Sequence, residues 1–197
     1  MPTSACGCQM WDDKLPGISQ TLPMNLYILR HASAGTRRAN PKLDVKRPID
    51  KEGKQQCLLV GSYLNALNVQ FDRVVSSPLK RALQTASLVS NETGYEGKIE
   101  IAEALSPEAS VAGFQDLVRA LEKYDTVLVV GHNPNLAVFL GSLIAPGRTS
   151  IRLRKGAVAR IDCTRLPGTL HWLVDPRILR GIYSKATKRS RPKTSRK

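Results

Sequence analysis

The chain has 197 residues, of which 42% are hydrophobic, so it holds enough apolar material for one folded domain of ordinary size. Its formal net charge is +14. Eight of the positive charges lie between Arg180 and Lys197, where there is no acidic residue, which leaves +6 for the preceding residues. The longest apolar run, Leu136 to Ala145, is far shorter than the roughly 20 residues of a membrane-spanning helix. This composition argues against a disordered chain and against an integral membrane protein.

The N-terminal residues and the cysteines indicate the compartment. Asp12 and Asp13 are charged, and no apolar segment typical of a secretory signal accompanies them, so we expect a cytoplasmic protein. Cys6 and Cys8 are close together, but no second Cys/His pair with zinc-ligand spacing occurs, and the cysteines at positions 57 and 163 stand alone. We therefore predict reduced thiols, with no disulfide framework and no zinc site.

The sequence divides into three parts. Residues 1–23 have no useful periodicity and contain Pro16, Gly17 and Pro23, so we interpret them as an N-terminal extension. Residues 24–179 form the expected domain. Residues 180–197 form a basic tail that we predict to be disordered and able to contact polyanions without sequence preference. No internal repeat is visible.

From Met24 onward, strand patterns alternate with helix patterns. The second expected element, a helix, has apolar residues at helical spacing and Asp50 as its N-cap, and Pro78 lies near the first turn of the next helix. The last two strands are joined through Pro167-Gly168, which predicts a hairpin. The expected strands are, in chain order, 25–29, 71–76, 99–102, 125–130, 156–163 and 169–174, and the expected helices are 50–67, 78–90, 111–121 and 135–144.

This alternation predicts the fold class. Strands that alternate with helices imply βαβ crossovers, a mainly parallel sheet and helices on both faces. The C-terminal hairpin adds at least one antiparallel strand. We therefore expect a three-layer α/β/α fold that ends in a hairpin.

Polar side chains follow the ends of four of the expected strands. Arg30 and His31 end the first strand, Arg81 lies one turn into the helix after the second, Glu103 follows the third, and His132 follows the fourth. In a parallel sheet of this kind, ligands bind beyond the carboxyl ends of the strands. We therefore expect these two histidines, two arginines and one carboxylate at the same edge of the sheet.

Two arginines and two histidines around one point suit phosphoryl transfer. Guanidinium groups match phosphate oxygens bidentately, a neutral imidazole can attack phosphorus, and a second imidazole, if protonated, can donate to the phosphoryl oxygens. The helices that begin after Pro78 and Pro134 would direct further amide donors to the same anion. The sequence offers no carboxylate cluster that would hold magnesium, so we predict no metal and no cofactor.

Four motifs resemble one known family. The chain from Met24 to about Val174 is similar to the histidine phosphatase superfamily (branch 1), whose signature is an RHG motif and whose fold is phosphoglycerate mutase-like. Within it, one stretch resembles the SixA-type phosphohistidine phosphatases. The motifs are ILRHASAG (28–35), DVKRPIDKEG (44–53), SSPLKRALQTA (76–86) and VGHNPNL (130–136), the second being the SixA-type stretch.

The resemblance implies a role for each candidate site residue. His31 would be the nucleophile, and Arg30, Arg81 and His132 would form the phosphate pocket. We add Ser33 and Arg37, which follow the nucleophile, as substrate-binding residues, and Glu103 as a candidate proton donor.

The length of the chain bears on the substrate. Phosphoglycerate mutases and fructose-bisphosphatases of this superfamily carry an acid-bearing insertion between the second arginine and the second histidine motif, whereas here only Glu103 and Glu108 lie in the later part of that interval. A phosphoramidate needs no positioned acid, but an alkyl phosphate ester does. We therefore favour a phosphohistidine-bearing protein as substrate. A small sugar or nucleotide phosphate is the alternative, and a non-catalytic phosphate or nucleic-acid binder is a third hypothesis.

Other residues have simpler interpretations. His171 alternates with apolar neighbours and fits a strand residue, and Cys57 fits the core. Ser76 and Ser77 can cap a helix or donate to phosphate, and Asn133 fits a turn. A solvated loop and a substrate contact both remain open for the cationic residues after the nucleophile: Arg37, Arg38, Lys42, Lys46 and Arg47.

Overall fold

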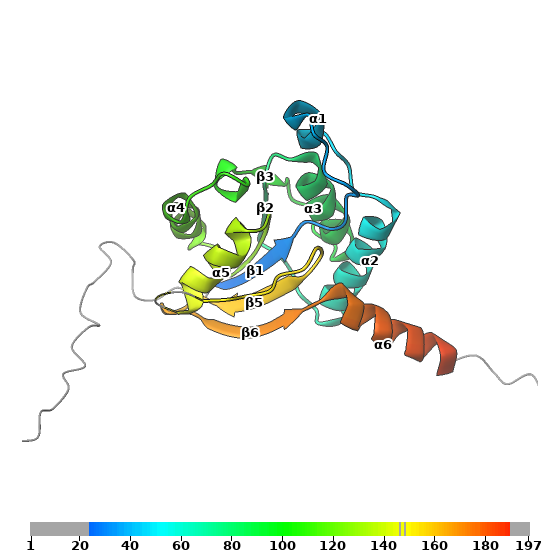
Figure 1. Cartoon of the computed structure of the whole chain (residues 1–197). Coiled ribbons are helices and arrows are strands. Elements are labelled where there is room, and N and C mark those ends of the chain that lie inside the picture. Colours follow the sequence, from blue (N-terminus) through cyan, green and yellow to red (C-terminus); the bar gives the residue numbers. More distant parts are fainter. Residues whose placement is uncertain (1–23, 146, 148, 190–197) are drawn as a thin grey trace, which may run out of the picture.

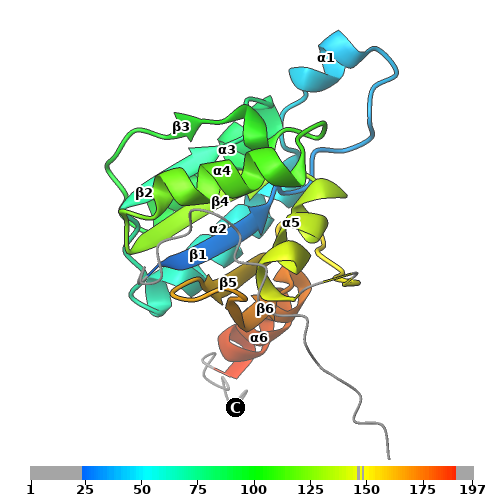
Figure 2. The ribbon, with the colours of Figure 1, turned by 90° about the vertical axis from the view of Figure 1, so that its left-hand side faces the viewer.

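The computed structural model describes residues 24–145, 147 and 149–189. The expected extension 1–23, with Cys6 and Cys8, and residues 190–197 of the basic tail lie outside the described residues. The described chain forms one six-stranded sheet (Figure 1), and its strand order, β3-β2-β4-β1-β5-β6, can be followed in Figure 2. The strands are β1 (Asn25–Arg30), β2 (Arg73–Ser76), β3 (Glu100–Ile101), β4 (Thr126–Gly131), β5 (Val158–Asp162) and β6 (Thr169–Val174).

Six α-helices and one 3₁₀ helix connect or follow these strands in the described residues. The helices are α1 (Pro41–Val45), α2 (Lys51–Ala66), α3 (Lys80–Glu92), the 3₁₀ helix η1 (Glu103–Leu105), α4 (Val111–Leu121), α5 (Asn135–Ile144) and α6 (Pro176–Arg189). All ten expected strands and helices are present. α4, α5 and β6 have the expected bounds.

The sheet is mainly parallel, as expected. β1 pairs in parallel with β4, and β2 pairs in parallel with both β3 and β4. β5 runs antiparallel to β1 and to β6, so the last two strands form the expected hairpin. Because β1, β4 and β2 are neighbours, their carboxyl ends meet at one edge of the sheet.

Alternate side chains of the central strands enter two separate cores, because successive strand residues point to opposite faces. Leu26 and Ile28 of β1 pack with residues of α4 and α5 on one face. Tyr27 and Leu29 pack with residues of α2, α3 and α6 on the other. The expected α/β/α layers are therefore confirmed, and Figure 1 shows α4 and α5 on one side of the sheet and α2 and α3 on the other.

The structure corrects the expected boundary of the domain at residue 179. α6 continues to Arg189, so residues 180–189 are helical rather than part of a disordered tail. The helix forms because Leu179 is buried and Tyr183 is half-buried against the core cluster that α2 shares. The many basic residues of this segment made the apolar face of the helix difficult to recognise in the sequence.

Two smaller differences concern helix starts. Pro78 lies before the N-cap residue of α3, Leu79, and not inside the first turn. α1, which has five residues, and η1 were not expected, because neither is long enough to show a period. Among the described helices, none combines the length and the hydropathy that crossing a membrane requires.

Candidate active site

The ends of β1 and β4 bring His31 and His132 together. The amide of His31 donates to the carbonyl of Gly131 at 3.1 Å, which ties the residue after β1 to the residue before His132. The two imidazole rings lie 4.8 Å apart between centroids. Both residues are buried, with exposed fractions of 6% and 3%. The expected pairing of the two histidines at one sheet edge is therefore confirmed.

The backbone fixes the protonated nitrogen of His31. Its Nδ1 lies 2.8 Å from the carbonyl oxygen of Ala32, and a carbonyl can only accept, so Nδ1 carries the hydrogen and Nε2 keeps a lone pair. Burial lowers the pKa of His31, and the hydrogen bond to Ala32 opposes this effect by raising it. The charges of Arg81 and Arg30 lower the pKa further, to about 3. The ring is therefore neutral at physiological pH.

His132 is held by Ser77, which the sequence left open between capping and phosphate contact. The Nε2 of His132 lies 2.9 Å from Ser77 Oγ, and this oxygen also accepts a long bond of 3.4 Å from the amide of Leu79. We infer that the Ser77 hydroxyl donates to Nε2, which places the ring hydrogen on Nδ1. The Nδ1 atom is buried and has no partner among the described residues. Burial and the neighbouring His31 lower the pKa of His132 to about 2.

Each of the two arginines uses one nitrogen to hold its position. Arg30 Nη1 donates to the carbonyl of Leu153 at 2.9 Å. Arg81 Nη1 donates to the backbone oxygen of Asp44 at 3.0 Å and to its carboxylate at 3.3 Å. The Nε atoms of both arginines are buried without a partner among the described residues. Such anchored guanidinium groups, with donors to spare, can bind an anion without rearranging.

Asp44 links the loop after His31 to Arg81, and the sequence did not single it out. Its carboxylate also accepts from Arg47 Nε at 2.8 Å and from the amide of Arg38 at 2.9 Å. Burial raises the pKa of Asp44, but these bonds and the charges of Arg47 and Arg81 outweigh it and lower the pKa to about 2. The carboxylate is therefore charged and holds the guanidinium of Arg81 in place.

Arg47 is not a solvated loop residue. It is buried, and its Nη1 donates to the carbonyls of Ala34 at 2.6 Å and Gly35 at 3.1 Å. These bonds fasten the segment after His31 to the turn after α1. The resemblance of residues 44–53 to the SixA-type stretch was the only signal in the sequence for this arrangement.

Ser33 is tied to the start of α2. Its hydroxyl donates to Asp50 Oδ2 at 2.8 Å, and the amide of Gly35 donates to the same oxygen at 2.7 Å. The other carboxylate oxygen of Asp50 accepts from the amide of Gly53 at 2.7 Å, so the expected N-cap is confirmed. The bond to Asp50 gives Ser33 a role in shaping the loop, and its contact with substrate stays a prediction.

Glu103 forms no hydrogen bond with either histidine among the described residues. It begins the short helix η1, which packs against the end of β4: a Cβ atom on Gly131 would lie 3.2 Å from the carbonyl oxygen of Leu105. The Glu103 side chain is exposed and accepts from Ser106 Oγ at 2.7 Å. The segment after β3 therefore reaches the same sheet edge as His132, but the Glu103 side chain is bonded to Ser106 and not to an imidazole. The general-acid role of Glu103 stays a prediction.

Two exposed side chains act on Arg81 through their charge. Arg37 lowers the pKa of Arg81 and Glu108 raises it, while burial is the largest cause of its lowered value. Arg37 is therefore close enough for its charge to act on Arg81, and its contact with substrate stays a prediction. Glu108 is the acid after β3 whose charge acts on Arg81. Neither contacts the imidazole rings through a hydrogen bond among the described residues.

The simpler interpretations hold for His171 and Cys57, but Ser76 does not cap α3, whose N-cap residue is Leu79. His171 is exposed on β6, with its Nε2 4.0 Å from Asp162, and Cys57 is a buried free thiol. Ser76 donates only to the carbonyl of Ser77. Asn133 donates through Nδ2 to the carbonyl of Leu153, the same oxygen that Arg30 binds.

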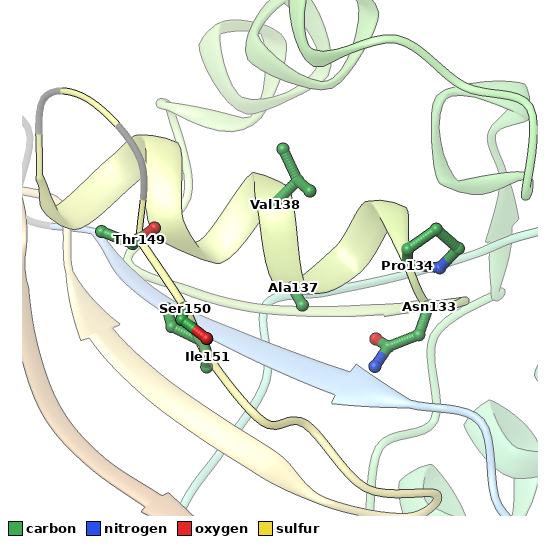
Figure 3. Close-up of a pocket in the computed structure, with 7 residues that line it drawn as sticks. All are labelled: Asn133, Pro134, Ala137, Val138, Thr149, Ser150 and Ile151. Carbon is green, nitrogen blue, oxygen red and sulfur yellow. The ribbon is translucent and has the colours of Figure 1, made fainter.

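A hollow of about 400 Å³ lies between α5 and the segment before β5 (Figure 3). Asn133 connects it to the candidate site, because this residue lines the hollow and donates to the Leu153 carbonyl that Arg30 also binds. The hollow is lined by Asn133, Pro134, Ala137, Val138, Thr149, Ser150 and Ile151. Within the described part of the chain, no group of three His, Cys, Asp or Glu side chains could hold a metal ion.

Two neutral imidazoles flanked by anchored arginines, at the carboxyl edge of a mainly parallel sheet, define a site for phosphoryl groups. The family comparison agrees: residues 26–108 match the model of the histidine phosphatase superfamily (branch 1). An uncharacterised protein of Picosynechococcus sp. (strain ATCC 27264 / PCC 7002 / PR-6) is 32% identical over 143 residues, which cover 68% of this chain and 82% of that protein. The chain belongs to this superfamily.

Similar proteins include a phosphohistidine phosphatase. The chain is 29% identical to the phosphohistidine phosphatase SixA of Escherichia coli (strain K12) over 156 residues, which cover 78% of this chain and 94% of that protein. A solved structure of the protein histidine phosphatase SixA in complex with tungstate superposes with a TM-score of 0.71 at 27% identity, covering 79% of this chain and 99% of that one. The expected phosphoglycerate mutase-like fold is therefore confirmed.

Proposed function

We propose that this protein is a phosphohistidine phosphatase in which His31 receives the phosphoryl group and water then releases it. The observation that supports this role most directly is the bond from Nδ1 of His31 to the Ala32 carbonyl, which leaves the lone pair on Nε2 of a neutral ring. A neutral imidazole nitrogen can attack phosphorus. The similarity to SixA supports a protein-bound phosphohistidine as the substrate.

The proposed reaction has two steps. In the first, Nε2 of His31 forms a bond to phosphorus, the bond from phosphorus to the substrate imidazole breaks, and that imidazole takes a proton from solvent. In the second, water attacks phosphorus, the bond from phosphorus to Nε2 breaks, and phosphate leaves while the proton of the water passes to solvent. His31 returns to its neutral state, so neither step needs a metal or a cofactor.

Arg30, Arg81 and His132 are the proposed partners of the phosphoryl oxygens. The unpaired Nε atoms of the two arginines and the unpaired Nδ1 of His132 are buried donors that an anion would satisfy. These groups are fixed before substrate arrives, by Leu153, Asp44 and Ser77 respectively. Donors fixed in this way stabilise developing charge without reorganisation. Arg37 and Ser33 remain proposed substrate contacts at the mouth of the site.

The choice of phosphohistidine over a phosphate ester depends on the leaving group. Glu103 is exposed and bonded to Ser106, and no described carboxylate donates to or accepts from either imidazole. An alkyl ester needs a positioned acid, whereas a leaving imidazole does not. A sugar or nucleotide phosphate is the second candidate substrate, with Glu103 or Glu108 as the acid. The third hypothesis is a non-catalytic binder. It is disfavoured because binding alone does not require a neutral imidazole with a free lone pair, which His31 has.

A panel of substrates tests the proposal. The protein should hydrolyse a phosphohistidine-bearing protein faster than sugar phosphates, and trapping should yield an acid-labile, base-stable phosphoryl adduct on His31. His31→Ala should abolish turnover and the adduct, while His171→Ala, the matched control on β6, should retain both. Glu103→Gln should leave phosphohistidine hydrolysis nearly unchanged. Efficient hydrolysis of sugar phosphates that Glu103→Gln reduces about 10²–10⁴-fold would instead establish the ester phosphatase.

The location and a second partner are part of the proposal. Cys57 and Cys163 are buried free thiols, which suits a reducing compartment such as the cytoplasm. Arg180 and Lys185 are exposed on α6, and the chain beyond them is also basic. We include in the proposal that this C-terminal segment contacts polyanions through its charge.

A further inference from the structure

The loop before β5 is bonded to the same residues that form the phosphate pocket. The carbonyl of Leu153 accepts from Arg30 Nη1 and from Asn133 Nδ2, each at 2.9 Å. The amide of Gly156 donates to the carbonyls of Arg30 at 3.1 Å and His31 at 3.2 Å. Four hydrogen bonds therefore set the position of this loop relative to the nucleophile.

The loop is also fixed from its outer side. Arg154 Nε lies 3.3 Å from the carboxylate of Asp175. Gly156 has a φ of +71°, and a Cβ atom there would meet Pro176 at 3.0 Å and Gln56 at 3.1 Å, so only glycine fits without a shift. The backbone of Lys155, which lies between these two residues, therefore has one position beside the end of β1.

In the described part of the chain, Lys155 lacks the acidic partner that two neighbouring arginines have. Arg47 has Asp44, and Arg154 has Asp175. The side chain of Lys155 is half-buried, and among the described residues it forms no ion pair or hydrogen bond. An ammonium group without a bonded partner keeps its three donors available to an anion.

The positive charge of Lys155 changes the pKa of two residues at the site. It lowers the pKa of His31, after the larger effects of burial and of the two arginines. It also lowers the pKa of Asp50, whose oxygens already accept from Ser33, Gly35 and Gly53. Both effects agree with the place of the Lys155 backbone, next to Gly156, whose amide is bonded to the carbonyls of Arg30 and His31.

We propose that Lys155 is a further substrate-binding residue, whose ammonium group donates to an oxygen of the phosphoryl group on the β5 side of His31. This inference rests on the proposed function, because it places the phosphoryl group at His31. Arg81 and Arg47 approach the site from the α1 side, whereas Lys155 comes from the opposite, β5 side. A flexible ammonium group suits an oxygen that moves as the phosphoryl group is transferred.

Inorganic phosphate is the probe for this proposal, measured by calorimetry on the full-length protein and without turnover. Lys155→Met should weaken phosphate binding about tenfold or more, as expected for the loss of a charge-assisted hydrogen bond, and should raise KM for a small aryl phosphate. Lys155→Arg should restore part of the affinity. Arg152→Met, which removes the same charge from an exposed position on the same segment, should change binding less than twofold.

An Asp50→Asn background separates direct binding from an effect through Asp50. A direct contact predicts that Lys155→Met weakens phosphate binding equally in both backgrounds. If the effect disappears in Asp50→Asn, or if folded Lys155→Met and Lys155→Gln bind phosphate as the wild type does, this inference is wrong while the proposed function stands. A wild-type protein that binds no phosphate and forms no adduct on His31 would overturn both.

Discussion

His132 depends on a single hydroxyl group for its orientation. Ser77 Oγ lies 2.9 Å from Nε2 of His132, and both residues are buried. Ser77→Ala should leave Nε2 without a partner and lower kcat/KM about tenfold, because a buried acceptor without a donor costs about 1–3 kcal/mol. Steady-state kinetics with a small aryl phosphate would measure the loss, and Ser77→Thr should restore part of it.

The neighbouring serine provides the control for this prediction. Ser76 is equally buried, but its hydroxyl bonds only to the backbone carbonyl of Ser77. Ser76→Ala should therefore keep most of the activity. Equal losses in the Ser76 and Ser77 variants would show that the region is sensitive to packing and not to the tautomer of His132.

At the scale of the elements, α2 approaches the loop after His31 very closely. A Cβ atom on Gly53 would lie 2.1 Å from the carbonyl oxygen of Ser33, and the backbone on both sides is fixed by Asp50. Gly53→Ala should therefore push the loop away from α2, lowering the free energy of unfolding by about 1–3 kcal/mol and reducing kcat. Denaturant unfolding and kinetics with a small aryl phosphate would measure both effects.

A second helical glycine supplies the matched control. Gly181 of α6 is exposed, and a Cβ atom there would meet nothing within 4 Å. Gly181→Ala should stabilise the protein by about 0.5–1 kcal/mol, because alanine loses less backbone entropy in a helix. A stabilised Gly53→Ala variant would contradict the close approach of α2 to Ser33.

The sequence was informative where a pattern is local and long enough to repeat. α4, α5 and β6 were predicted with their observed bounds, because their apolar residues alternate at one clear period. α1 could not be predicted, because its five residues are held by the Asn40 cap and by the bonds from Asp44 to Arg47 and Arg81. Such tertiary bonds leave no period in the sequence.

The same distinction applies to the site. The proximity of His31 and His132 could be predicted, because both follow strands of a parallel sheet, and strand ends gather at one edge. The partner of Glu103 could not, because its carboxylate accepts from Ser106 within a short 3₁₀ helix that the sequence pattern does not reveal. The place of Lys155 also required the structure, because this residue precedes an antiparallel strand whose amino end lies beside the carboxyl end of β1.

At the scale of the whole molecule, α6 anchors the C-terminal segment to the domain. Tyr183 is half-buried against the core cluster under α2, and Arg180 lies 3.7 Å from Glu52. Truncation after Leu179 should therefore lower the free energy of unfolding by about 1–2 kcal/mol. Truncation after Arg189 should leave both stability and turnover of a small aryl phosphate unchanged, as thermal unfolding and kinetics would show.

The same two truncations test the proposed contact with polyanions. Both should weaken binding to a nucleic acid of arbitrary sequence, and the remaining binding should fall steeply with salt. Loss of turnover in the protein truncated after Arg189 would mean that the last eight residues take part in the site. Unchanged nucleic-acid binding would remove the polyanion contact from the proposal.

The central position of β1 has a consequence for local stability. The amide of Arg30 donates to the carbonyl of Ala157, just before β5, and the amides of His31 and Ser77 donate to the carbonyls of Gly131 and Val130 in β4. Hydrogen exchange at these amides should require global unfolding, whereas the exposed backbone around Arg37 and α1 should exchange through small local openings. The side of the pocket formed by the sheet therefore opens only when the whole domain unfolds. The side formed by α1 opens at a lower free energy, because it is a loop held by Asp44 and Arg47.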